Sequence, residues 1–167
     1  MPKKKTIYKP GDFFLVPLRS NGLALGLISR IDHDGGLIAY FFNEKYLSPP
    51  SLTEVSMKTT ADSIFICSLG DRGFKLGTWI VLGILPGFKP EHWPMPPFAR
   101  KDALTGEFSR ITYDEKDFFT ELEHIPISKD EAVFLPPDGT FGHGAVEIRL
   151  TKLLEQQPAT LPSSLQK

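Results

Sequence analysis

Short apolar runs separated by turn residues fill the first part of the chain. Residues 12–18, 23–31 and 37–42 are mostly apolar, and the breaks between them carry Asn-Gly at 21–22 and Asp-Gly at 34–35. Such a pair between apolar runs is a strong short-range signal for a β-hairpin. We therefore predict three antiparallel strands joined as a meander.

More strands are expected further along the chain. Residues 62–69 and 77–85 are two further apolar runs, and residues 108–113 alternate between apolar and polar, as in a half-buried strand. Gly26 interrupts the second run, which indicates a bulge or a close approach of neighbouring groups at that point.

The pattern changes to a helical period near the end, where residues 142–154 are expected to form a helix that Pro158 terminates. One face of this helix is apolar, and Glu147 and Thr151 lie on the polar side. The apolar face consists of Val146, Leu150, Leu153 and Leu154.

The predicted fold is α+β, with a predominantly antiparallel, strongly curved (barrel-like) sheet and a C-terminal helix. A chain of 167 residues has the length of one domain, which we place at residues 1–157. Residues 158–167 are rich in Pro, Ser and Gln and are expected to form a disordered tail.

The stretch Trp-Pro-Met-Pro-Pro-Phe at 93–98 has three interpretations. It could be a strip that binds a partner, a polyproline ligand for another domain, or a rigid connector whose aromatic side chains pack into the core. Exposing its large apolar side chains would create a patch that monomeric proteins avoid, so we favour the connector. The residues assigned structural roles are Trp79, Trp93, Pro94, Pro96, Pro97 and Phe98.

Composition indicates the class of protein and the cellular compartment. Hydrophobic residues make up 41% and charged residues 23%, which are ordinary globular values. The only cysteine, Cys67, lies in an apolar run and is expected to be a buried thiol. The lysine-rich start lacks the apolar stretch of a signal peptide, and no apolar run is long enough to span a membrane. A cytoplasmic protein is expected, with no membrane partner.

The net charge of -1 conceals an acidic block at residues 114–131, which contains seven acidic residues and only two basic ones, Lys116 and Lys129. This block is either a solvated surface or a face for a basic partner, because a field of one sign steers association. Phe118 and Phe119 inside it are either anchors of that interface or ordinary core contacts. The partner-binding candidates are Asp114, Glu115, Asp117, Phe118, Phe119, Glu121, Glu123, Asp130 and Glu131.

Motifs for catalysis or cofactor binding are absent from the sequence. The four histidines are not spaced as zinc ligands, and there is neither a Gly-x-Ser-x-Gly elbow nor a phosphate-binding glycine loop. We therefore predict no catalytic residues, no metal and no cofactor. A pI near 6.4 and the lack of a basic stripe argue against a nucleic-acid partner.

Four segments occur in a familiar order: 11–18, 36–42, 77–83 and 93–98. Together they resemble immunity protein family twenty-six of bacterial polymorphic toxin systems, from about Gly11 to Tyr113. The resemblance implies a mainly β, cytoplasmic bacterial protein, encoded beside a toxin that it binds and neutralises. It implies no catalytic residues, and it covers neither the acidic block nor the tail.

The function predicted on these grounds is neutralisation of a cognate protein toxin by occlusion of its active site. If the toxin is a nuclease, an acidic flank would suit its basic cleft. Two alternatives stay open: a small enzyme or accessory protein with an unrecognised cleft, or a nucleic-acid-binding β-barrel. A cleft that joins His92 or His143 to a carboxylate would favour the enzyme. The identity of the toxin and the oligomeric state are left open.

Overall fold

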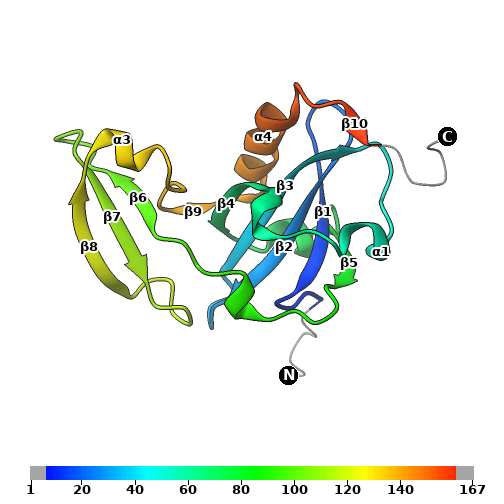
Figure 1. Ribbon diagram of the computed structural model, residues 1–167, viewed down its shortest axis with the longest axis horizontal. Helices are drawn as coiled ribbons and strands as arrows, with labels where there is room; N and C mark the ends of the chain where they lie inside the picture. The colour runs from blue at the N-terminus through cyan, green and yellow to red at the C-terminus, as the bar shows by residue number, and fades with distance from the viewer. Residues whose placement is uncertain (1–6, 161–167) are drawn as a thin grey trace.

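Two β-sheets of unequal size make up the protein (Figure 1), whose computed structural model describes residues 7–160. The seven-stranded sheet has the order β5-β1-β2-β3-β4-β9, with β10 beside β3, and the three-stranded sheet has the order β6-β7-β8. The large sheet contains β1 (Asp12–Pro17), β2 (Leu23–Ile31), β3 (Leu37–Tyr46), β4 (Ser63–Leu69), β5 (Ile80–Ile84), β9 (Thr140–Phe141) and β10 (Ala159–Thr160).

The small sheet contains β6 (Phe98–Lys101), β7 (Phe108–Tyr113) and β8 (Glu121–Ile127), and it projects to one side of the large sheet (Figure 1). Pairing is antiparallel throughout, except for β4 with β9 and β3 with β10, which are parallel. The helical segments are α1 (Leu52–Val55), η1 (Thr60–Asp62), α2 (Arg72–Lys75), η2 (Pro90–His92), α3 (Lys129–Ala132) and α4 (His143–Leu154).

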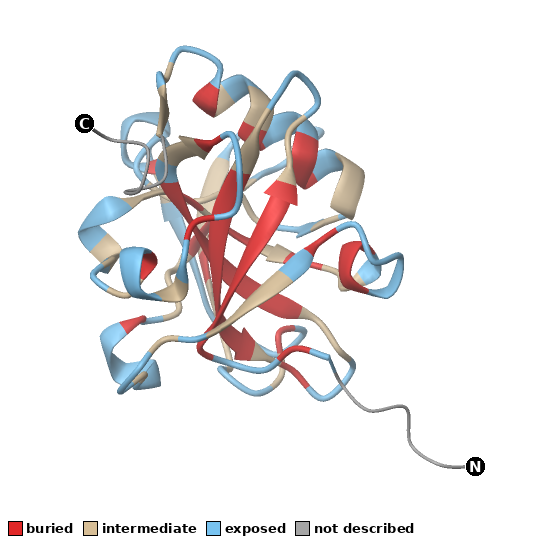
Figure 2. Cartoon of the chain, turned by 90° about the vertical axis from the view of Figure 1, so that its right-hand side faces the viewer, coloured by how far each residue is buried: buried red, intermediate tan, exposed pale blue. Residues whose placement is uncertain are grey.

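The central strands of the large sheet are buried on both faces, which explains why their sequences are apolar without alternation (Figure 2). Phe14 and Phe41 lie on the face that α2, α4 and Trp79 cover. Phe13 and Phe42 lie on the opposite face, where they pack with Trp93 and with Val55 of α1. Each fully buried apolar side chain of this kind contributes about 1.5–3 kcal/mol to folding.

The meander predicted from the hairpin signals is confirmed. The structure gives β2 the predicted bounds, and β3 extends four residues beyond the predicted run to Tyr46. Gly26 lies beside a register shift in the β2–β3 ladder. A Cβ at Gly26 would lie 2.6 Å from Phe14 Cζ and 2.8 Å from Phe41 Cε1, so the sheet packs closely here.

Two features of the predicted fold are wrong. Within residues 7–160, no sheet is closed or strongly curled, because the chain places β6, β7 and β8 in a second sheet and leaves the large sheet open between β5 and β9. The helix is also not the last element, since β10 follows α4 and pairs with β3. The α+β class with mainly antiparallel pairing is confirmed.

The placement of Glu147 on the polar side of the last helix is also wrong. Its side chain is nearly buried and accepts a hydrogen bond from Trp79 Nε1 at 3.2 Å. Arg19 forms an ion pair with it at 3.0 Å. A buried indole N–H requires a polar partner, and Glu147 supplies one where α4 meets the sheet.

The 93–98 stretch runs from the large sheet to the small one. Trp93 is 3% exposed and packs edge-on against Tyr40 and Phe42, while the hydroxyl of Tyr40 donates to the carbonyl of Pro94. Phe98 is buried where the two sheets meet, and Pro96 and Pro97 are half-buried. Trp79 is 3% exposed on the α4 side of the large sheet. These positions support the proposal that the stretch is a connector.

Three further expectations concern burial, membranes and the tail. Cys67 is fully buried, and desolvation raises the pKa of its thiol. Within residues 7–160, no helix has the length and apolarity needed to cross a bilayer. Of the predicted tail, Ala159 and Thr160 form β10, and residues 161–167 lie outside the described part of the chain.

Candidate functional site

The small sheet has one covered edge and one open edge. At β6, the Ala99 N–H donates to the carbonyl of Pro136 and the Asp138 N–H donates to the carbonyl of Ala99, both at 2.8 Å. Within residues 7–160, β8 pairs only with β7. Glutamates and Pro126 on β8 are residues that natural proteins use to keep such an edge from pairing indiscriminately.

The acidic block forms this open edge and the segments on either side of it. Residues 114–120 connect β7 to β8, and α3 follows β8. Every residue of β8 except Ile127 is exposed. The structure thus brings the predicted acids onto one projecting part of the molecule, the small sheet with its adjoining loop and α3.

Three of the seven acids form ion pairs with arginines of the same chain. Glu121 lies 2.7 Å from Arg100, Glu123 lies 3.8 Å from Arg110, and Glu115 lies 3.4 Å from Arg30. These pairs reduce the negative field that composition alone predicts. Glu121 also lies 3.6 Å from His124 Nδ1.

Two more acids shape the loop between β7 and β8. Asp114 Oδ1 accepts the backbone N–H groups of Lys116 and Asp117, at 2.9 and 3.0 Å. Asp117 Oδ1 accepts the N–H of Phe119 at 3.0 Å, and this bond holds the pKa of Asp117 below its ordinary value. Both carboxylates therefore fix the loop through backbone hydrogen bonds, and those at Asp117 favour its charged form.

The remaining two acids, Asp130 and Glu131, lie in the first turn of α3. The Ser128 side chain caps this turn by accepting the N–H of Glu131 at 3.1 Å. Neither carboxylate has an ion-pair partner within residues 7–160. Among the acids of the block, these two and the loop aspartates supply the uncompensated negative charge.

The two phenylalanines of the block separate. Phe118 is 9% exposed and packs with Ile38 and Phe98 in the apolar cluster between the sheets. Phe119 is 76% exposed. Ordinary core packing therefore describes Phe118, and only Phe119 is available as a surface anchor.

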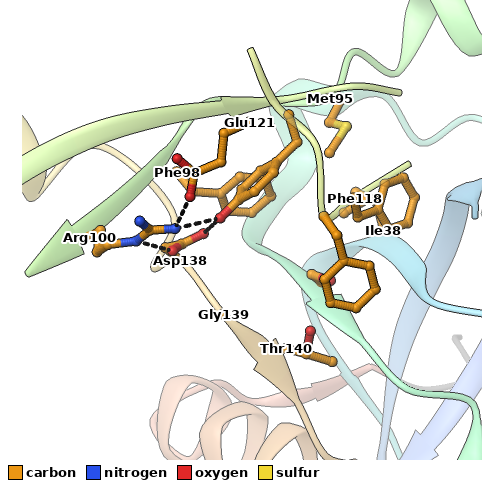
Figure 3. Close-up of a pocket in the computed structure, with 12 residues that line it drawn as sticks. Ile38, Met95, Phe98, Arg100, Phe118, Glu121, Asp138, Gly139 and Thr140 are labelled. Atoms are coloured by element: carbon orange, nitrogen blue, oxygen red, sulfur yellow. Dashed lines mark hydrogen bonds and ion pairs between the residues drawn. The ribbon is translucent and has the colours of Figure 1, made fainter. Parts of the chain in front are cut away.

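A pocket of about 210 Å³ lies where the small sheet meets the large one. Figure 3 shows the Arg100 guanidinium held between the carboxylates of Glu121 and Asp138 on one side, with Ile38, Met95 and Phe118 on the other. The complete lining is Ile38, Ser68, Met95, Phe98, Arg100, Tyr113, Phe118, Phe119, Glu121, Asp138, Gly139 and Thr140.

Four polar side chains of the pocket form one network. Arg100 Nε donates to Asp138 Oδ2 at 2.7 Å, and Arg100 Nη2 donates to Glu121 Oε1 at 2.7 Å and to the Tyr113 hydroxyl at 3.0 Å. The Tyr113 hydroxyl donates to Asp138 Oδ1 at 2.5 Å. Burial and this bond to Asp138 raise the pKa of Tyr113 to about 12, so the phenol is neutral at physiological pH.

His92 lines a different pocket, together with Lys58, Lys89 and Trp93, and its described lining contains no carboxylate. His143 begins α4 and lines neither this pocket nor the one around Arg100. Those described residues also contain no cluster of three or more potential metal ligands of the His, Cys, Asp or Glu type. Neither the pocket around Arg100 nor the one lined by His92 combines a histidine with a carboxylate.

The family model of Immunity protein 26 matches residues 9–110, more than half of the chain. The chain belongs to the immunity protein 26 family. No curated protein and no solved structure has significant similarity to it.

The part of the chain that matches the immunity protein 26 family ends within the small sheet. It includes β1 to β6 and ends at Arg110, inside β7. The loop after β7, the edge strand β8 and α3 all lie beyond it. The acidic block is thus built onto the family scaffold by a segment that the family model does not match.

Sequence reasoning missed three members of the pocket network: Arg100, Tyr113 and Asp138. Arg100 and Asp138 are 38 residues apart, and no motif connects them. The alternation in β7 does place Tyr113 on the same face as buried Ile111, which is the one local signal that could have indicated it.

Proposed function

We propose that this protein binds a cognate protein toxin and neutralises it by occluding the active site of the toxin, without catalysis of its own. Membership of the immunity protein 26 family carries this proposal. An inhibitor of this type needs a complementary surface rather than a catalytic constellation. The natural setting for the encounter is the cytoplasm of the bacterium that makes both proteins.

We further propose that the acidic block is the binding face. The open edge at β8, the exposed glutamates on it and Phe119 support this assignment, because protein interfaces combine a polar rim with a few aromatic anchors. The block lies beyond the residues that the family model matches, which suits a surface specific to one toxin.

The test of the function is an activity titration with the toxin whose gene neighbours that of this chain. Increasing amounts of the full chain are added to a fixed amount of toxin, and residual toxin activity is measured. We expect activity to fall to zero near an equimolar ratio. Full toxin activity in a large excess of the chain would rule out an immunity role against that toxin.

The binding face is tested by the kinetics of association. Glu121 is a poor target for this test, because its carboxylate pairs with Arg100 at 2.7 Å and lines the pocket between the sheets, so its loss would change more than the surface charge of the block. Asp130→Asn combined with Glu131→Gln removes two charges that have no ion-pair partner in the described part of the chain. We expect slower association and a weaker dependence on salt, with dissociation little changed.

A matched control removes the same net charge elsewhere. Glu91 of η2 and Glu155 after α4 are exposed acids outside the block. Glu91→Gln with Glu155→Gln should leave association almost unchanged. An equal effect of the two double variants would show that total charge, and not the acidic block, governs the encounter.

A further inference from the structure

The pocket between the sheets carries a net negative charge. Two carboxylates, Glu121 and Asp138, face one guanidinium, that of Arg100, and Tyr113 is neutral. Three donor contacts of Arg100 are directed at groups of the chain itself. The guanidinium is therefore already engaged and is poorly placed to attract an anion.

Aromatic rings surround the same space. Phe98 and Tyr113 pack edge-to-face with their centroids 6.0 Å apart, and Phe118 lies beside Ile38 in the same cluster. Phe119 completes the lining as its most exposed aromatic residue. Faces of aromatic rings attract cations, and the attraction grows when the cation is partly desolvated.

These two features select the ligand by its chemistry. An anion would meet two carboxylates, and a purely apolar group would desolvate the Arg100 network without replacing its water contacts. In Figure 3, Met95 and Phe118 lie across the pocket from the carboxylates of Glu121 and Asp138. A cation on an apolar stem would fit both walls, with the stem against Met95 and Phe118 and the charge between the carboxylates and the rings.

We propose that this pocket receives one basic side chain, an arginine or a lysine, of the cognate toxin. The proposal rests on the proposed function and deepens it, because it gives the interface a specific anchor point. Phe119 lines the pocket and is 76% exposed, and its backbone is fixed by the hydrogen bond from its N–H to Asp117. Aromatic residues, phenylalanine included, are enriched in protein interfaces.

The first test needs no toxin. The full chain, labelled for NMR, is titrated with N-acetyl-arginine amide and, separately, with N-acetyl-citrulline amide, which has nearly the same shape without the charge. We expect saturable shifts at Met95, Phe119 and Glu121 with the arginine derivative alone. Absence of saturation at tens of millimolar, or equal shifts with the citrulline derivative, would overturn the proposal.

Two variants with one control make the test specific. Phe119→Ala should weaken binding of the arginine derivative about two- to fivefold, and Glu121→Gln should weaken it by a similar factor. Phe134 is 87% exposed and does not line this pocket. Phe134→Ala should therefore bind the derivative as the natural chain does, and all three variants should be checked for an unchanged melting temperature.

The same pair of phenylalanine variants is then tested with the toxin. Phe119→Ala should accelerate dissociation of the complex about tenfold or more, and Phe134→Ala should not. If the natural chain fails to bind the toxin while the arginine derivative still occupies the pocket, the proposed function is wrong and the cation site remains. If the toxin binds and Phe134→Ala alone weakens the complex, the anchor lies elsewhere and the pocket proposal is wrong.

Discussion

Arg30 holds three parts of the protein together, and its replacement should destabilise the fold strongly. The side chain extends from β2 and is 8% exposed. Its guanidinium donates to the carbonyls of Trp93 at 2.9 Å and Pro90 at 3.1 Å, and it lies 3.4 Å from the Glu115 carboxylate. It thus ties the connector and the acidic loop to the large sheet.

The magnitude follows from those bonds. A hydrogen bond to a charged group contributes about 1.5 kcal/mol or more, and a buried carbonyl left without a donor adds to the loss. With two such carbonyls, Arg30→Met should lower the free energy of unfolding by about 3–4 kcal/mol. For a chain of this length, that corresponds to a melting temperature lower by about 6–16 °C.

Urea unfolding of the natural chain and of Arg30→Met measures this change. Glu115→Gln is the control, because the Glu115 side chain is 62% exposed and its ion pair should contribute less than about 1 kcal/mol. Acrylamide quenching of native fluorescence should increase in Arg30→Met, since both tryptophans are 3% exposed in the natural fold. A loss below about 1 kcal/mol with unchanged quenching would refute the role given to Arg30.

Three further predictions concern the core and its ionisable groups. Gly26→Ala should lower the free energy of unfolding, measured in urea, by about 1–3 kcal/mol or more, because the added Cβ would meet Phe14 and Phe41. Gly70→Ala is the control and should be close to neutral, because no atom lies within 4 Å of the added Cβ. Equal effects of the two variants would show that close packing at Gly26 does not limit the residue there. Cys67 should react with a thiol reagent only after unfolding, because burial raises the pKa of its thiol; immediate labelling of the native protein would contradict this. The free energy of unfolding should decline between pH 10 and about pH 12, because the pKa of Tyr113 is near 10 in the unfolded chain and about 12 in the folded protein. Tyr113→Phe should reduce this decline. Part of the decline should persist in the variant, because the pKa values of Tyr8 and Tyr46 are also raised by folding.

The sequence predicts an element well where burial of one or both faces produces a regular pattern of apolar residues. β2 and β7 have the predicted bounds, because their apolar residues pack on a core and end at turns. The apolar period of α4 predicts this helix for the same reason, but it wrongly places Glu147, which bonds to Trp79, on the polar side. Local pattern and tertiary packing agree at these elements.

Elements without such a pattern were missed. β8 consists of exposed side chains on a sheet edge, so neither face leaves an apolar period, and its charges are typical of a loop as much as of an edge strand. β9 and β10 have two residues each. Their pairing with distant strands depends on tertiary structure alone, and so does the division into two open sheets.

The sequence predicts which acidic residues form the candidate site, but it does not predict which other residues they contact. The acidic block does lie together at an open edge, but Arg30, Arg100 and Arg110 pair with three of its acids from other parts of the chain. Sequence spacing carries no information about such long-range pairs. The separation of Phe118 from Phe119 likewise follows from how the loop packs against Ile38.

Hydrogen exchange of the natural chain, free and bound to its toxin, tests whether the acidic block is the binding face. We expect binding to slow exchange in the loop at 114–120 and in β8, and to leave the buried strands β2 and β3 unchanged. Protection confined to another surface, such as the groove between β4 and residues 133–137, would show that the binding face lies elsewhere.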